Sequence, residues 1–219
     1  IEKVTGQKLE DFQADCFAHI REIAAKLPVR PQFLPPDVEA LEERAANNPN
    51  DAAVLCDLAQ AYLAAGQSEE ARERAEKALA IDPKISWGHV VLADVAMQQE
   101  KKDEAAALLR KAVANDPGNA SAWFMLGMLS KDAGDVAAAA EAFESGVAVY
   151  SVNPKAYEEL AGFYAQLDKP KERREALESW IKADPHNSEP ARELLGIYFD
   201  EKQWEDVLRI AQHMIFIVP

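Results

Sequence analysis

The chain has 219 residues, of which 48% are apolar and 28% are charged, and this balance excludes a disordered or collagen-like chain. Acidic residues outnumber basic ones by 38 to 24, which gives a net charge of −14. Sequence-independent binding to nucleic acid needs lysine and arginine to displace phosphate counterions. We therefore expect neither a nucleic acid nor an anionic membrane as a partner.

Residues 1–35 are expected to form a helix and a proline-rich connector at the end of an upstream domain. The large apolar residues of the helix share one face: Phe12, Cys16, Ile20, Ile23 and Leu27. Residues 28–36 contain four prolines, which favour an extended connector. The chain has no signal-peptide pattern and no initiator Met, so we expect a fragment of a longer protein whose location is open.

A period of 34 residues begins after this connector. Prolines fall on one lattice with this spacing, at Pro49, Pro83, Pro117, Pro185 and Pro219. If each proline is numbered as position 32 of a repeat, the repeats start at Ala52, Ser86, Ala120, Pro154 and Ser188. Residues 36–48 then fit the second half of a degenerate repeat and are expected to cap the array, which spans residues 36–219.

Each repeat contains two stripes of apolar or small residues at helical spacing. In the first repeat, positions 4, 7, 8 and 11 are Leu55, Leu58, Ala59 and Tyr62, and the second stripe is Ala71, Ala75, Ala78 and Leu79. Gly66 and Gly134 lie at position 15, between the two stripes, and are expected to form the turn. The pattern predicts an all-α solenoid of about five helical hairpins.

The repeat resembles the tetratricopeptide repeat (TPR) family, whose signature has Trp, Leu, Gly, Tyr, Ala, Phe and Pro at these positions. The resemblance covers residues 52–219. It implies a right-handed α–α superhelix and a protein-interaction module. Residues 5–12 also resemble the end of the catalytic domain in some bacterial zinc peptidases that carry repeat tails, which implies a hydrolase upstream of this chain.

The chain itself has no pattern of residues that carries catalysis. Zinc peptidases need two histidines four residues apart with a glutamate between them, and the four histidines here have no such spacing. His89 lies at a packing position, and the two cysteines, Cys16 and Cys56, are interpreted as reduced, packed thiols. We expect no enzyme activity, no metal site and no cofactor.

The resemblance implies that positions 2, 5, 9, 12 and 13 line the concave face of the superhelix. This places ten candidate partner-binding residues there: Cys56, Gln60, Leu63, Trp87, Val90, Asp94, Met97, Phe124, Met128 and Lys131. Three interpretations stay open: Trp87 or Phe124 belongs to the core, the N-terminal helix fills the groove through Phe12 and Phe17, or a partner binds there.

The expected partner is a protein or peptide with an apolar or amphipathic segment. Residues 36–83 carry eleven acidic and four basic residues, which favours a basic segment near the first repeat. Ile215 and Ile217 have no further helix in this chain to cover them, so self-association through the C-terminal repeat is also expected. The alternative function is the C-terminal repeat tail of a larger hydrolase.

Overall fold

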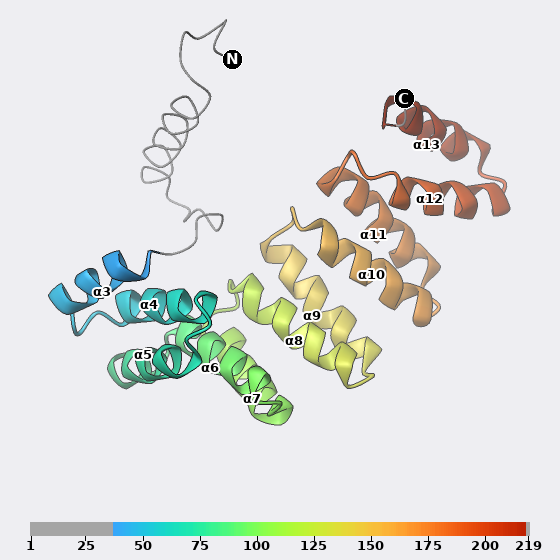
Figure 1. The fold of residues 1–219 in the computed structure, drawn as a ribbon. Coiled ribbons are helices and arrows are strands. Elements are labelled where there is room, and N and C mark those ends of the chain that lie inside the picture. The colour runs from blue at the N-terminus through green and yellow to red at the C-terminus, as the bar shows by residue number, and fades with distance from the viewer. Residues whose placement is uncertain (1–36, 218–219) are drawn as a thin grey trace, which may run out of the picture. The chain divides into compact units, whose positions relative to one another are not determined.

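The structure is a computed structural model that describes residues 37–217, with side chains as far as Met214 (Figure 1). The described residues form eleven helices and no strand. The bounds are α3 Val38–Asn47, α4 Ala52–Ala64, α5 Ser68–Ile81, α6 Ser86–Gln98, α7 Lys102–Asn115, α8 Ala120–Asp132, α9 Val136–Val149, α10 Pro154–Gln166, α11 Pro170–Ala183, α12 Glu189–Asp200 and α13 Trp204–Ile217. The expected helix and connector in residues 1–35 lie outside the described residues and stay a prediction.

The helices from α4 to α13 form five hairpins, as the two stripes predict. The first helix of each hairpin packs against its second helix, and that second helix packs against the first helix of the next hairpin. The capping helix α3 packs against α4 in the same way. The predicted all-α superhelix of hairpins is confirmed for the array.

The turn inside each hairpin has the same backbone feature. Position 15 has a positive φ in all five repeats: 77° at Gly66, 62° at Glu100, 79° at Gly134, 53° at Asp168 and 58° at Lys202. The N–H of the next residue bonds the carbonyl at position 11, as in Gln67 to Tyr62 at 2.8 Å, which is part of a Schellman motif. The turn therefore forms even where glycine is absent, although a left-handed non-glycine residue costs about 1–2 kcal/mol.

Tyrosines at position 11 join neighbouring repeats. The phenol of Tyr164 donates to Glu144 at 2.6 Å, and that of Tyr198 donates to Glu178 at 3.0 Å. Tyr62 donates to Glu42 of α3 in the same way. Glu42 thus takes the place that the second helix of a preceding repeat would supply, which agrees with the interpretation of α3 as half of a degenerate repeat.

Small residues allow the helices to approach closely. Alanines in the second helices are fully buried, as at Ala71, Ala75, Ala105 and Ala139. The buried apolar residues form three clusters along the array, from α3 to α6, from α6 to α8 and from α9 to α13. Each cluster is shared by successive hairpins, so the core continues from one repeat to the next.

Candidate interaction surface

The ten predicted partner-binding residues lie on α4, α6 and α8, and their exposure differs. Cys56 and Val90 are buried, whereas Met128 and Lys131 are exposed. The other six are half-buried: Gln60, Leu63, Trp87, Asp94, Met97 and Phe124.

Cys56 and Val90 are corrections to the predicted surface, since neither has accessible area to offer a partner. Both lie at position 5, and both belong to buried clusters. The first helices α4 and α6 contact each other directly, so side chains at this position are covered. Burial, with a smaller contribution from Asp82, raises the pKa of the Cys56 thiol to about 12, which makes it an unreactive packed thiol.

Phe124 forms part of the packing between α8 and α9. A Cβ on Gly146 of α9 would lie 2.3 Å from Cε1 of Phe124, so the ring occupies the space that a larger side chain would need. The converse contact joins Phe143 of α9 to Gly127 of α8, where a Cβ would lie 2.4 Å from Cδ2 of the ring. The two rings are 5.6 Å apart. Phe124 therefore packs mainly inside its own hairpin, which is one of the interpretations that the sequence left open.

Trp87 joins two parts of the core. It is half-buried and packs against both the α3–α6 cluster and the α6–α8 cluster. Its indole therefore has a structural role in addition to any contact with a partner.

Eight of the predicted residues keep accessible area, and one of them, Phe124, packs mainly inside its own hairpin. We call the other seven the interaction face: Gln60, Leu63, Trp87, Asp94, Met97, Met128 and Lys131. They come from three successive first helices. Lys131 forms an ion pair with Glu159 of α10 at 2.6 Å, which offsets its charge. Asp94, which carries the carboxylate of the face, is half-buried.

Asp94 gives a stability prediction. Burial raises the pKa of its carboxyl, and a hydrogen bond to Gln98 lowers it by less. The protonated Asp94 carboxyl therefore favours the folded state over the unfolded state. This contribution is fully present below about pH 4 and is lost as the pH rises through the raised pKa. Asp94→Asn should raise the melting temperature at pH 7 by up to about 4 °C, and this increase should become smaller toward pH 4.

Thermal unfolding followed by circular dichroism measures the melting temperatures. Glu141→Gln, an exposed control on α9, should show no such gain, and an unchanged or lower melting temperature for Asp94→Asn would contradict the prediction.

The last hairpin exposes a second apolar area. The rings of Phe199 on α12 and Trp204 on α13 are 5.5 Å apart and meet edge to face. Their exposed fractions are 60% and 54%, and that of Leu208 is 63%. The side chains of Ile215 and Ile217, from which self-association is predicted, lie outside the described residues.

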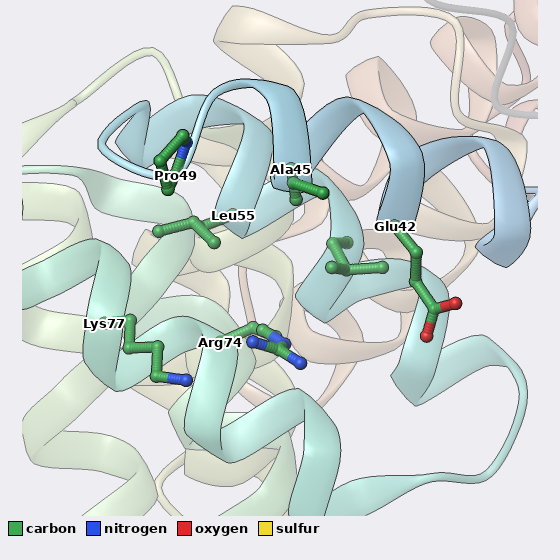
Figure 2. Close-up of a pocket in the computed structure, with 8 residues that line it drawn as sticks. Glu42, Ala45, Pro49, Leu55, Arg74 and Lys77 are labelled. Carbon is green, nitrogen blue, oxygen red and sulfur yellow. The ribbon is translucent and has the colours of Figure 1, made fainter.

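A third feature was missed by the reasoning from sequence. A pocket of about 360 Å³ lies between α3, α4 and α5, and Arg74 and Lys77 of α5 reach it (Figure 2). The signal in the sequence was a pair of basic residues three positions apart within the acid-rich residues 36–83. Only packing of the three helices shows that these residues share a pocket with α3.

The described residues contain no group of three or more His, Cys, Asp or Glu side chains that could hold a metal ion. His89 is buried, and its Nε2 lies 3.3 Å from the carbonyl oxygen of Pro83, which agrees with a structural role. Burial lowers the pKa of the His89 ring.

Within residues 37–217, no helix combines the length and the apolar character needed to cross a membrane.

These features define a helical-repeat scaffold for protein interactions. The sequence matches the family model of the cilia and flagella-associated protein 70 middle TPR-like domain over residues 39–149 and a tetratricopeptide repeat model over residues 131–188. The chain belongs to the tetratricopeptide repeat family. The family and its fold are typical of non-catalytic scaffolds. No curated protein matches the sequence.

Solved structures share the fold at low sequence identity. YrrB, described as a TPR protein with an unusual peptide-binding site, matches with a TM-score of 0.61 and 19% identity over 83% of this chain and 94% of YrrB. PilF of Pseudomonas aeruginosa matches with a TM-score of 0.58 and 21% identity over 79% of each chain. MamA of Desulfovibrio magneticus RS-1 matches with a TM-score of 0.54 and 17% identity over 76% of this chain and 93% of MamA.

Proposed function

We propose that this chain is a non-catalytic scaffold that binds an apolar or amphipathic segment of a partner protein on its interaction face. The observation that carries the proposal is the set of half-buried or exposed apolar side chains on three successive first helices: Leu63, Trp87, Met97 and Met128. Contiguous exposed apolar patches are typical of interaction sites, and we propose that these four side chains form one. The peptide-binding site described for YrrB, which has the same fold, supports a peptide as the ligand.

The partner segment is proposed to be basic. Asp94 lies on the interaction face, and its half-buried carboxylate is destabilised by desolvation. A lysine or arginine of a partner would restore the lost electrostatic stabilisation of this carboxylate. The acidic excess of residues 36–83 would also attract a basic segment toward the first repeat.

The test uses a fluorescein-labelled amphipathic peptide of leucine and lysine, with binding followed by fluorescence anisotropy. Met97→Ala combined with Met128→Ala should weaken binding at least tenfold, because both changes remove apolar contact area. Val149→Ala is the matched control, since Val149 has a similar exposed fraction to Met128 but lies on the second helix α9. Equal affinity of the double variant and the wild type would contradict the proposal.

Self-association is proposed to use the last hairpin, through the exposed pair Phe199 and Trp204. Analytical ultracentrifugation checks this. Trp204→Ala should shift a dimer toward monomer, and a wild-type chain that is monomeric at high concentration would contradict it.

The hydrolase-tail alternative rests on residues 5–12, which lie outside the described residues. The coding sequence upstream of Ile1 decides it. A helix with the His-Glu-x-x-His motif would support the alternative, and further repeats or a start codon would contradict it.

A further inference from the structure

The pocket between α3, α4 and α5 combines an apolar lining with two cations. Its apolar lining consists of Ala45, Ala46, Pro49, Leu55 and Leu58. Its charged lining consists of Glu42, Arg74 and Lys77. Figure 2 shows Arg74 and Lys77 on α5, with Leu55, Ala45 and Glu42 on the helices across from them. The volume, about 360 Å³, is in the range of small-molecule sites.

Among the described residues, no ion pair joins Arg74 or Lys77 to an acidic side chain. Arg74 lies beside the Tyr62 phenol, but its buried Nε has no hydrogen-bond acceptor among the described residues. Glu42, the one acidic residue of the lining, accepts a hydrogen bond from the same phenol. The Nε of Arg74 has almost no accessible surface, so a ligand in the pocket would contact the terminal nitrogens of the half-buried guanidinium.

A second pocket in the same array shows which parts of this site come from the repeat itself. It lies between α9, α10 and α11, and its Tyr164–Glu144 bond matches the Tyr62–Glu42 bond. At the repeat positions of Arg74 and Lys77, this second pocket has Ala176 and Ser179. Its lining also contains Glu172 and Glu175. The shape that the two pockets share therefore follows from the packing of the repeats. Of the two, only the pocket between α3, α4 and α5 has basic residues in its lining.

We propose that the pocket between α3, α4 and α5 binds a small apolar monocarboxylate, of the size of benzoate. The planar guanidinium of Arg74 donates to the carboxylate, and the ammonium of Lys77 supplies the second positive charge. The body of the ligand lies on Leu55, Leu58 and Ala45. This site uses no residue of the interaction face, so it is independent of the proposed scaffold function.

Titration of the full chain with sodium benzoate tests the proposal, and the Nε–H resonance of Arg74 in nitrogen-15 NMR spectra is the direct readout. For a ligand of this size we expect a Kd on the order of 0.1–1 mM. Benzoate should shift the Arg74 resonance in a saturable way. Benzamide, which lacks the charge, and inorganic phosphate, which lacks the apolar body, should bind at least tenfold more weakly.

Lys77→Gln and Arg74→Gln should each weaken benzoate binding at least tenfold. Lys111→Gln is the matched control, because Lys111 lies at the same repeat position in the next repeat and is outside the pocket. Circular dichroism confirms that each variant is folded, and Lys77→Gln, which alters an exposed side chain, keeps the test decisive if Arg74→Gln is unstable. An unshifted Arg74 resonance, equal binding of phosphate, or binding only of a peptide with a free C-terminal leucine would overturn the proposal.

Discussion

Phe143→Ala is expected to destabilise the array by about 3–5 kcal/mol, as truncation of a buried phenylalanine does. The Phe143 ring is buried, packs 5.6 Å from Phe124 and 5.5 Å from Phe163, and fills the space beside Gly127. It thereby joins α8, α9 and α10. Its removal leaves a cavity that the rigid crossing of α8 and α9 cannot close. Urea denaturation followed by circular dichroism at 222 nm measures the free energy of unfolding.

Tyr150→Ala is the matched control for this prediction, because it also truncates an aromatic ring. Tyr150 is exposed at the end of α9, the helix that carries Phe143, and belongs to none of the three apolar clusters. Its truncation should change the free energy of unfolding by less than about 1 kcal/mol, because little apolar area is lost from the core. Similar losses in the two variants would show that Phe143 does not hold the hairpins together.

Gly146→Ala and Gly162→Ala are expected to have opposite effects. Both glycines lie inside helices, where alanine is favoured over glycine by about 1 kcal/mol. The new Cβ at position 146 would lie 2.3 Å from the Phe124 ring, whereas no atom lies within 4 Å of a Cβ at position 162. Overpacking costs about 1–3 kcal/mol and exceeds the helix preference at Gly146.

Gly146→Ala should therefore lower the free energy of unfolding, and Gly162→Ala should raise it by up to about 1 kcal/mol. The same urea titrations measure both changes, and each variant is the control for the other. A stabilised Gly146→Ala variant would mean that the Phe124 ring can leave the crossing of α8 and α9. Phe124 would then be free to contribute to the interaction face.

The sequence alone determined the hairpins and where they begin. Helices start at Ala52, Ser86, Ala120 and Pro154, as the 34-residue period predicts, and the fifth starts at Glu189, one residue after the predicted Ser188. These bounds depend on local physics, namely the spacing of apolar residues along a helix and the effect of proline on its end. The burial of His89 and of Ala71 could be predicted for the same reason, because each lies at a repeat position whose side chain faces a neighbouring helix.

Only the tertiary structure decided which side chains of the predicted face are accessible. Cys56 and Val90 share a repeat position with Phe124, yet contact between α4 and α6 covers the first two, and the third fills the space beside Gly146. The pocket of Arg74 and Lys77 likewise needs Glu42 and Ala45 of α3, about 30 residues earlier in the sequence. Helical periodicity specifies the direction of a side chain on its own helix. The distance between helices is set by the side chains that meet at each crossing, so exposure is decided only when the helices pack.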